Sequence, residues 1–433
     1  MSDQSQRPSL LPAAGQEDAE HMKDYLKRGG YTAARRVISE LHPTDVIAVV
    51  EKSGLRGLGG AGFPVARKWQ LARAGGRSPR YLVANAYDAD PAAPVARALL
   101  ERNPFAVLEG LTIAAHAIGA TDVYVYCRAD NEAANRRLRA AIAEAEEHDF
   151  VGYEAFQGRR PLIVRTVVGW GGFSGGEETA ALEAIEGNRA MPRQKPPYPT
   201  EAGLWGSPTV VHSVETLANL PAIVRDPAAF GAGSKLLALS GPLANPGLVE
   251  VPFGTPLREI VAGSAGGLAG GRQLKAVQIG GPTGAVLPPS LLDTALDFDA
   301  LAKVGAFVGS GSVRVLADDT CIVGFARDRF AYLAAEACGK CVPCRLGIHR
   351  MAATLEGIAS GLGRDSDISL LEEFANVIGK GSLCGFGITA PAVLRSTLAH
   401  FREDYRVHIE EKRCPTGRCQ PLRTRRFERK AAV

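Results

Sequence analysis

The stretch "RYLVANAYDADP", Arg80 to Pro91, decides the fold class of this chain. Its first half is an apolar run typical of a buried strand, which we expect from Tyr81 to Asn85, and its second half is an acidic loop. An apolar helix follows at "PFAVLEGLTIAAHAIGA", and then a second strand at "DVYVYCRA". Strands that alternate with helices predict an α/β domain with a mostly parallel sheet. In such domains ligands bind where loops leave the carboxyl ends of the strands.

The pattern changes outward from this stretch. Residues 18–50 have helical spacing of apolar residues, with a break at Gly29-Gly30. From about Lys235 the chain has short apolar strands with Pro/Gly turns, and after residue 320 it becomes helical again. We therefore predict five segments: 1–50, N-terminal tail and helices; 51–230, α/β domain; 235–315, β-rich domain; 320–412, helical bundle; and 413–433, a basic tail with cysteines.

Composition excludes several classes of protein. With 46% hydrophobic and 22% charged residues among 433, the chain is typical of a globular protein with a sizeable core. It contains no apolar run of membrane-spanning length and does not begin like a signal peptide, so we expect a cytoplasmic protein without a membrane span. A net charge of +4 is too small to argue for nucleic acid. The basic tail "RCQPLRTRRFERKAAV" is either solvated or docks on an acidic partner.

Four of the 8 cysteines form one pattern. Cys338, Cys341 and Cys344 are each separated by two residues, and Cys384 stands alone downstream. Without an export signal the thiols stay reduced, and a cysteine cluster then indicates metal. A triplet with one remote cysteine is typical of a [4Fe–4S] cube, whereas closed zinc sites more often use paired Cys-x-x-Cys turns. We predict a [4Fe–4S] cluster, with zinc and free thiols as the alternatives.

The remaining cysteines divide into two groups. Cys127 lies alone in a strand pattern and is expected in the core. Cys414 and Cys419 closely follow His408, and with Cys321 they could form a Cys₃His zinc site. Reduced structural or surface thiols are the alternative.

A glycine-rich loop, "GLGGAGF" from Gly57 to Phe63, precedes an expected helix. Its backbone N–H groups can close on a phosphate or a flat ring, although a plain turn has the same composition. Lys68 lies five residues beyond Phe63 and could pair with a phosphate. Carboxylates follow at Asp88, Asp90, Glu177 and Glu178, of which the last pair also suits the first turn of a helix.

Together these motifs resemble the flavin-bearing, NADH-oxidising subunit of respiratory complex I and its relatives in NAD-linked hydrogenases and formate dehydrogenases. The resemblance runs from about residue 25 to 420 and rests on "GLRGLGGAGFPVARKW", "YLVANAYDADP", "GGEETAALEAIEGNRAMPRQKPPYP", and "EACGKCVPCRLG" with "SLCGFG". It implies a Rossmann-like FMN/NAD domain, a ubiquitin-like β-grasp (soluble-ligand-binding) domain and a C-terminal helical bundle with the iron–sulfur cluster.

By this resemblance NADH gives a hydride to FMN, and single electrons pass to the cluster. The loop glycines and Lys68 would cradle FMN, Glu178 and Lys195 would orient NAD(H), and Phe63 and Tyr198 would stack near its rings. The cofactor-binding positions that it implies are Gly57, Gly59, Gly60, Gly62, Phe63, Lys68, Asn85, Asp88, Asp90, Gly176, Glu177, Glu178, Lys195, Tyr198, His212 and Ser213. Expected partners are a two-iron ferredoxin-like subunit and a larger catalytic subunit such as a formate dehydrogenase or a hydrogenase.

The chain departs from the family pattern on the flavin side. Leu58 replaces an arginine, Tyr87 begins a Tyr-Asp-Ala-Asp run in place of Asp-Glu-Gly-Glu, His212-Ser213 replace paired asparagines, and Gly175 replaces a cysteine. Two interpretations stay open. Either FMN and NAD(H) still bind, or the chain is a flavin-less relay and structural subunit that keeps the cluster. A different nucleotide or electron donor in the altered pocket is a third alternative.

Overall fold

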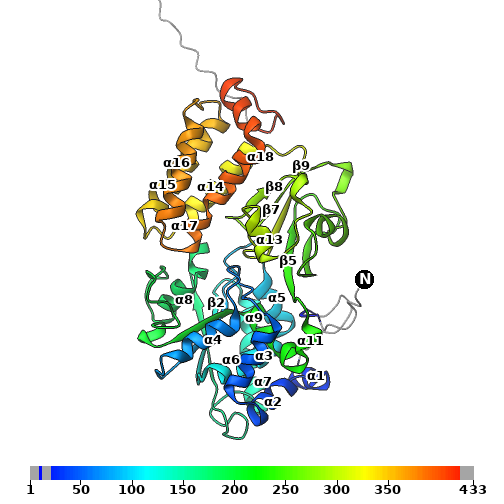
Figure 1. Ribbon diagram of the computed structural model, residues 1–433, viewed down its shortest axis with the longest axis vertical. Helices are drawn as coiled ribbons and strands as arrows, with labels where there is room; N and C mark the ends of the chain where they lie inside the picture. The colour runs from blue at the N-terminus through cyan, green and yellow to red at the C-terminus, as the bar shows by residue number, and fades with distance from the viewer. Residues whose placement is uncertain (1–8, 12–20, 420–433) are drawn as a thin grey trace, which may run out of the picture.

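The computed structural model describes residues 9–11 and 21–419 (Figure 1). The expected N-terminal lead-in and most of the basic tail lie outside the described residues. The α/β domain lies at one end of the molecule, and the β-rich domain and the helical C-terminal part lie side by side toward the other end (Figure 1).

The first sheet has four strands in the order β3-β2-β1-β4, and all neighbours are parallel. The strands are β1 (Tyr81–Ala86), β2 (Asp122–Arg128), β3 (Ile163–Gly169) and β4 (Thr209–Ser213). The predicted parallel α/β fold is therefore confirmed. Because β1 and β4 are neighbours, the acidic loop after β1 and the end of β4 leave the same edge of the sheet.

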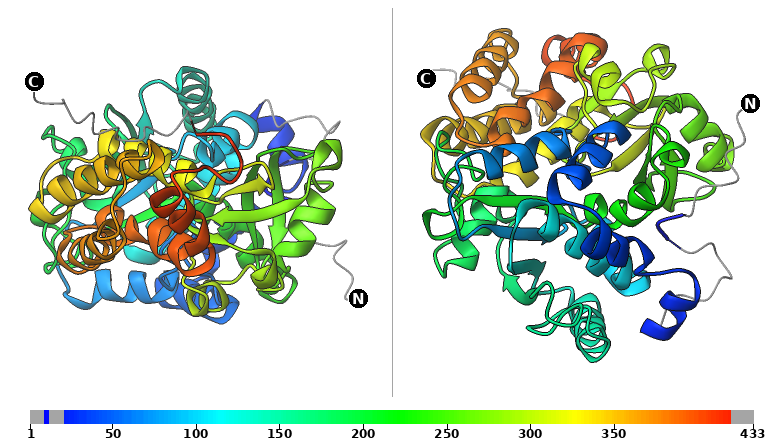
Figure 2. Two further views of the ribbon diagram at one scale, coloured as in Figure 1. Left: turned by 90° about the horizontal axis from the view of Figure 1, so that it is seen from above. Right: turned by 60° about the horizontal axis from the view of Figure 1, so that its bottom comes forward.

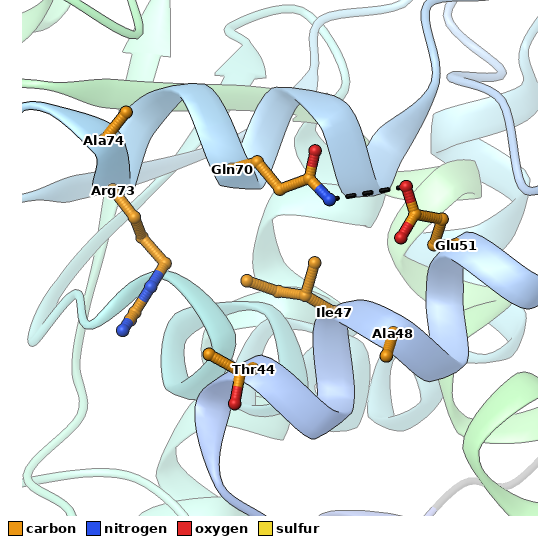
Figure 3. Close-up of a pocket in the computed structure, with 7 residues that line it drawn as sticks. All are labelled: Thr44, Ile47, Ala48, Glu51, Gln70, Arg73 and Ala74. Atoms are coloured by element: carbon orange, nitrogen blue, oxygen red, sulfur yellow. Dashed lines mark hydrogen bonds between the residues drawn. The ribbon is translucent and has the colours of Figure 1, made fainter.

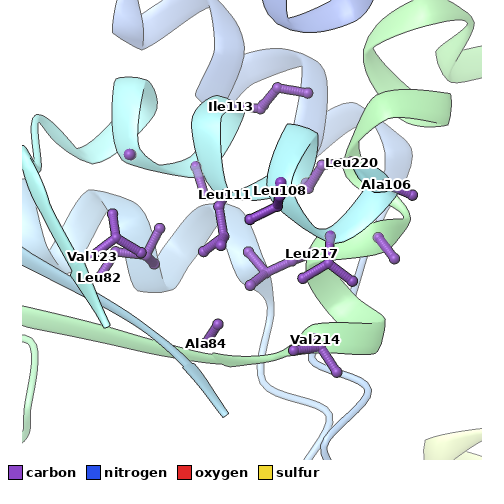
Figure 4. Packing of buried hydrophobic residues seen from close by; sticks show 14 of the residues in the cluster. Leu82, Ala84, Ala106, Leu108, Leu111, Ile113, Val123, Val214, Leu217 and Leu220 are labelled. Carbon is purple, nitrogen blue, oxygen red and sulfur yellow. The ribbon is translucent and has the colours of Figure 1, made fainter. Parts of the chain in front are cut away.

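Helices cover both faces of this sheet. Helix α6 (Pro104–Ile118) packs on one face, where Leu82 and Leu111 meet Leu217 of α9 (Val214–Ala218) (Figure 4). Helix α8 (Glu178–Ile185) covers the opposite face. At Gly110 the two helices α6 and α9 are so close that a Cβ atom would overlap the carbonyl oxygen of Leu217. Cys127 is buried in β2, as predicted.

The N-terminal helices pack on the outer side of α6 (Figure 2). They are α1 (Met22–Lys27), α2 (Thr32–Glu40) and α3 (Pro43–Ser53), with the expected break between α1 and α2. The buried carboxylate of Glu109 on α6 accepts hydrogen bonds from Tyr25 Oη at 2.6 Å and from Ala34 N at 3.2 Å. The domain is completed by α4 (Val65–Ala74), α5 (Val95–Arg102), α7 (Glu132–Glu147), α10 (Leu220–Arg225) and α11 (Pro227–Phe230).

The second sheet has five strands in the order β6-β5-β9-β7-β8. They are β5 (Ser234–Ser240), β6 (Gly247–Pro252), β7 (Leu274–Ile279), β8 (Ala285–Leu287) and β9 (Ser312–Ala317). The central pair β5 and β9 is parallel and the other pairs are antiparallel, which is the arrangement of a β-grasp fold. Two short helices accompany it: α12 (Leu257–Glu259) and α13 (Phe298–Lys303).

The C-terminal part is helical, as predicted. It consists of α14 (Ile322–Glu336), α15 (Val342–Ala359), α16 (Asp367–Gly381), α17 (Gly385–Thr389) and α18 (Pro391–Glu410), with a core that includes Phe330, Met351, Leu355 and Leu394. Within residues 9–11 and 21–419 no helix combines the length and apolar character needed to cross a bilayer. The predicted divisions between the five segments stay predictions.

Candidate functional site

The four cysteines predicted to hold a cluster lie at helix ends. Cys341 is the N-cap of α15, Cys344 lies in its first turn, Cys384 is the N-cap of α17, and Cys338 lies between α14 and α15. Burial, and then the thiols of the other three cysteines, raise the pKa of Cys344 to about 12. The thiols of Cys338, Cys341 and Cys384 therefore lie close enough to Cys344 to disfavour its ionisation, and a positively charged metal centre there would stabilise the thiolates.

The connection between Cys338 and Cys341 needs a left-handed residue, and Gly339 supplies it with φ of +79°. Pro343 lies in the first turn of α15 and packs against Gly381, where a Cβ atom would lie 3.0 Å from the proline ring. Gly339 and Pro343 therefore shape the segment that carries Cys338, Cys341 and Cys344.

The second group of ligands converges on one point. Cys321 is the N-cap of α14, His408 lies in the last turn of α18, and Cys414 and Cys419 follow in the next loop. The four ligand atoms all lie within 4.8 Å of one another. Cys321 Sγ is 3.5 Å from His408 Nε2 and 3.6 Å from Cys419 Sγ, and these are distances between ligands of one tetrahedral ion.

The orientation of His408 supports metal binding. Its Nδ1 lies 2.6 Å from the backbone oxygen of Asp404, which places the proton on Nδ1 and directs the lone pair of Nε2 toward the sulfur atoms. Ligating histidines in metalloproteins are commonly fixed by such a bond from the other ring nitrogen. The residues present therefore fit a single metal ion.

In the α/β domain, two lysines and two glutamates form a network of ion pairs. Lys195 Nζ lies 3.0 Å from Glu177 Oε1 and 2.7 Å from Glu178 Oε1. Lys68 Nζ lies 3.0 Å from Glu178 Oε2 and 2.9 Å from the carbonyl oxygen of Val211. Burial opposes ionisation of Glu178, but Lys68 and Lys195 outweigh it and lower the pKa of this carboxyl to about 2.

Two large aromatic side chains near this network in sequence are exposed. Phe63 ends the glycine-rich loop and is 46% exposed, and Tyr198 follows Lys195 and is 54% exposed. Exposed rings of this size beside charged groups suit the stacking of a nucleotide. The backbone of the loop is open at Gly59 and Ala61, which are also exposed. The residues present therefore fit FMN and NAD(H).

The end of β1 is joined to the loop before α8. Asn85 Nδ2 donates to the carbonyl oxygen of Gly176 at 2.8 Å, and its Oδ1 accepts from Tyr87 N at 3.1 Å. The structure thus places Asn85 and Gly176 next to the glutamates that begin α8. Glu177 itself caps α8, since its carboxylate accepts from the backbone N–H groups of Thr179 and Ala180.

Two glycines of the loop have a structural role that the sequence did not reveal. Gly60 has φ of +118°, and a Cβ atom there would lie 2.9 Å from the backbone of Gly309 in the β-grasp domain. At Gly62 a Cβ atom would lie 2.5 Å from the ring of Phe298 in α13. These two glycines are therefore required by domain packing, independently of any ligand.

Leu58 is buried, and its N–H donates to Thr216 Oγ1 at 2.9 Å.

The acidic residues after β1 are engaged in protein contacts. The two carboxylate oxygens of Asp88 accept from the backbone N–H groups of Ala96 and Arg97, at 2.8 and 2.7 Å, at the start of α5. Asp90 accepts from Ser310 Oγ at 2.6 Å, across the boundary with the β-grasp domain. Neither carboxylate is hydrogen-bonded to the lysine–glutamate network, and their predicted role in cofactor binding stays a prediction.

The pair at the end of β4 is also engaged. His212 is buried, and its Nε2 accepts from Trp69 Nε1 at 2.8 Å. Burial, and then the charge of Lys68, lower the pKa of His212 to about 3, so the ring is neutral. Ser213 caps α9 by accepting from Thr216 N at 3.2 Å. Both remain predicted cofactor contacts.

The side chain of Tyr87 packs against residues of the α/β domain. Its ring stacks on Tyr126 with centroids 5.2 Å apart, and its hydroxyl donates to the carbonyl oxygen of Gly171 at 2.8 Å. The expected position of this ring next to the flavin stays a prediction. A Cβ atom at Gly175 would lie 2.8 Å from Tyr87 Oη. The tyrosine and this glycine are therefore compatible with each other, and a side chain at 175 would displace the ring.

A surface groove of about 330 Å³ lies between α3 and α4 (Figure 3). It is lined by residues that include Ile47, Glu51, Gln70 and Arg73, and Gln70 Nε2 donates to Glu51 Oε1 at 3.4 Å. None of its lining residues belongs to the predicted sites, and it carries no functional assignment.

Comparison with known proteins defines the class. Residues 50–222 match the Nuo51 FMN-binding domain, and residues 324–408 match the NADH-ubiquinone oxidoreductase-F iron-sulfur binding region. Together with the geometry above, these matches define an electron-transfer component of an oxidoreductase, with an FMN-binding-type domain and a [4Fe–4S] region.

The relatives narrow the class to one family. The chain is 41% identical to the second F-type subunit of the NADH-quinone oxidoreductases of Rhizobium meliloti, over 94% of this chain and 99% of that protein. It is 39% identical to the HndC subunit of the NADP-reducing hydrogenase of Solidesulfovibrio fructosivorans, over 94% of this chain and 84% of that one. The chain belongs to the family of NADH-quinone oxidoreductase F-type subunits, whose members include components of multi-subunit complexes.

The fold of the chain also matches that of a solved structure. The chain superposes on the crystal structure of an NAD⁺-reducing [NiFe]-hydrogenase in the H₂-reduced state with a TM-score of 0.79 at 33% identity. The match covers 90% of this chain, which spans 66% of the hydrogenase chain. The predicted resemblance to complex I and hydrogenase subunits is confirmed.

Proposed function

We propose that this chain oxidises NADH through a bound FMN and passes the electrons singly to a [4Fe–4S] cluster on Cys338, Cys341, Cys344 and Cys384. The observation that carries the proposal is the network of Lys68, Glu177, Glu178 and Lys195, which joins the helix after the glycine loop to the start of α8 and to the Pro-rich loop. Bound FMN supplies the conversion between a two-electron donor and one-electron acceptors.

Different residues of the chain bind different parts of the two cofactors. Lys68 and the N–H groups of the glycine loop hold phosphate, while Lys195 and Glu178 orient NAD(H) between the exposed rings of Phe63 and Tyr198. Glu178 stays ionised because its pKa is about 2. Burial disfavours the charged form of Lys195, but Glu178 and Glu177 outweigh it and raise its pKa, so both charges persist at neutral pH.

The module works inside a larger cytoplasmic complex. A two-iron ferredoxin-like subunit and a larger catalytic subunit, such as a hydrogenase or a formate dehydrogenase, are the proposed partners. The similarity to a hydrogenase subunit and to a hydrogenase structure supports a redox partner of this type.

A flavin-less relay that keeps the cluster is the second candidate. It is supported by the internal use of Asp88, Asp90, His212 and Ser213, whose side chains are bonded to protein groups.

The test is the cofactor content and activity of freshly isolated complex. We expect about one acid-released FMN and about four iron atoms per chain, together with NADH-dependent dye reduction. Iron without flavin, and no dye reduction, would reject the first function in favour of the relay.

We further propose that Cys321, His408, Cys414 and Cys419 bind one zinc ion. The support is that their ligand atoms lie within 4.8 Å of one another, whereas the four thiolates of a cube bind four different irons and stand further apart. Metal analysis should show about one zinc per chain besides the iron of the cluster. Iron in place of zinc, in a Cys384→Ala variant that lacks the cluster, would contradict the assignment.

A further inference from the structure

We infer that the loop of residues 171–176 is the contact through which electrons cross from the flavin side to the cluster, and that Glu336 and Tyr87 are the positioning residues that hold this loop in place. The inference rests on the proposed function and adds the route within the chain. The loop precedes α8 and reaches toward the end of the helical bundle that carries α17 (Figure 1).

Glu336 binds the loop from the bundle side. Phe173 N donates to Glu336 Oε2 at 2.5 Å, and Ser174 Oγ donates to the backbone oxygen of Glu336 at 3.3 Å. At Gly172 a Cβ atom would overlap Glu336 Oε2, so a side chain there would displace this carboxylate. Glu336 ends α14 and stands two residues before Cys338, so the loop is fixed to the start of the cluster segment.

The loop also touches the other half of the cluster site. The ring of Phe173 lies 5.7 Å from the ring of Phe386, measured between centroids. Phe386 follows Cys384 by two residues, and the backbone N–H groups of Phe386 and Gly387 bond to the Cys384 sulfur. Through Glu336 and Phe386 the loop therefore contacts both segments that carry cluster cysteines.

Tyr87 holds the opposite side of the loop. Its hydroxyl donates to the carbonyl oxygen of Gly171, and its ring stacks on Tyr126 with an angle of 5° between the planes. The space for the ring depends on Gly175, since a side chain there would meet Tyr87 Oη. The loop is thus held between a tyrosine of the α/β domain and a glutamate of the bundle.

The loop continues directly into the nucleotide-side network. Only Ser174, Gly175 and Gly176 separate Phe173 from Glu177, which binds Lys195. Each NADH that is oxidised gives NAD⁺, one proton and two electrons. With FMN and the cluster bound, the electrons would pass singly across the loop, and an iron–sulfur acceptor of the partner complex would take the first from the cluster before the second arrives. The contacts of Glu336 and Tyr87 would fix the distance across which each electron passes.

The experiment compares Glu336→Ala with Glu336→Gln in the full complex. The glutamine keeps a carbonyl acceptor for Phe173 N–H, and the alanine does not. Turnover of NADH with ferricyanide reports the flavin, and stopped-flow bleaching of the cluster with NADH reports the crossing. We expect Glu336→Ala to slow the bleaching at least about tenfold, with ferricyanide turnover and iron content unchanged and with Glu336→Gln close to wild type.

A second variant tests the loop from the other side. Gly175→Ala adds a Cβ atom 2.8 Å from Tyr87 Oη and should slow cluster bleaching in the same way. Tyr87→Phe, which removes the hydroxyl that donates to the carbonyl oxygen of Gly171, should slow the bleaching as well. The Gly175→Ala variant decides the question if Glu336→Ala loses iron, because Gly175 lies on the flavin-side loop and is not next to a cluster ligand in sequence.

The outcomes separate the route from the proposed function. Wild-type bleaching rates in iron-loaded Glu336→Ala and in Gly175→Ala would overturn the inference and leave the proposed function intact. A wild-type complex without NADH–ferricyanide turnover would overturn the proposed function, and the inference with it.

Discussion

The metal ligands of the helical bundle and the charged network of the α/β domain are built in opposite ways. Cys338, Cys341 and Cys344 are each separated by two residues around the start of α15, so a short spacing in sequence becomes a short distance in space. The network combines Lys68 of α4, the glutamates of α8, and Lys195 of a Pro-rich loop. Three of the four cluster cysteines can be read from one segment of sequence, whereas the network depends on the packing of the sheet.

The two regions also differ in how charge is balanced. In the bundle, burial and the neighbouring thiols raise the pKa of Cys344, and a bound cation would lower this pKa again. In the α/β domain each carboxylate already has an ammonium partner, with distances from 2.7 to 3.0 Å. We therefore expect removal of a ligand residue to cost the bundle its metal, whereas changes in the network should alter nucleotide binding and leave the metal in place.

The largest effect is expected at Cys384. The variant Cys384→Ala leaves three thiolates for a four-iron cube, and the iron content should fall from about four per chain to near zero. The metal bound at Cys321 and His408 should stay, because no residue is shared between the sites. Iron and zinc are measured per chain on the same sample.

The reciprocal variant is the control. Cys419→Ala removes one ligand of the second site, 3.6 Å from Cys321 Sγ, and should lose that metal while the iron of the cluster stays. If either single substitution removed both metals, the two sites would not be independent. Iron at the wild-type level in Cys384→Ala would contradict the cluster assignment.

Much of the fold could be predicted from the sequence because its signals are local. The apolar run at residues 81–85 is β1, and the alternation of strands and helices gives the parallel sheet. The helical C-terminus follows from its apolar spacing. The placement of β4 next to β1 is a long-range contact without a local signal, and it is this contact that brings His212 beside Trp69.

The site could be predicted only in part for the same reason. The sequence singled out Lys68, Glu177, Glu178 and Lys195, and the structure brings them together. It did not reveal that Asp90 bonds to Ser310, since that bond joins two domains. Glu336 was also missed. Its position two residues before the cysteine triplet was the only available signal, and its partner, Phe173, is distant in sequence.

An intermediate effect is expected at Glu178. The variant Glu178→Gln removes the charge that binds both Lys68 and Lys195, and the KM for NADH should rise about tenfold because a hydrogen bond to a charged group contributes about 1.5–3 kcal/mol. Iron content should not change, and the free energy of unfolding should fall by roughly 2–3 kcal/mol, because Lys68 and Lys195 lose their shared partner in a largely buried site. Steady-state kinetics and urea unfolding check both statements.

Glu183 offers a matched control on the same helix. Its carboxylate pairs with Arg193 Nε at 2.5 Å, outside the network, so Glu183→Gln should keep the wild-type KM. Equal KM values for both variants would show that the network does not take part in nucleotide binding.

The smallest effect is expected from the pH dependence of stability at His212. Its folded-state pKa of about 3 lies below the ordinary value of about 6.5, so the unfolded chain binds the proton more tightly. Stability from the neutral ring is fully present above pH 6.5 or so and is lost as the pH falls toward 3. Between pH 7.5 and 5.5 this one group should cost roughly 1.4 kcal/mol of unfolding free energy.

The variant His212→Gln isolates this contribution. Its amide oxygen can still accept from Trp69 Nε1, but it does not titrate, so the difference in unfolding free energy between pH 7.5 and 5.5 should shrink by roughly 1.4 kcal/mol. The exposed histidine His400 on α18 provides the control, and His400→Gln should keep the wild-type difference. Urea unfolding at the two pH values measures both. An unchanged difference in His212→Gln would mean that water reaches the imidazole ring of His212, so that the α/β domain does not exclude solvent at the end of β4.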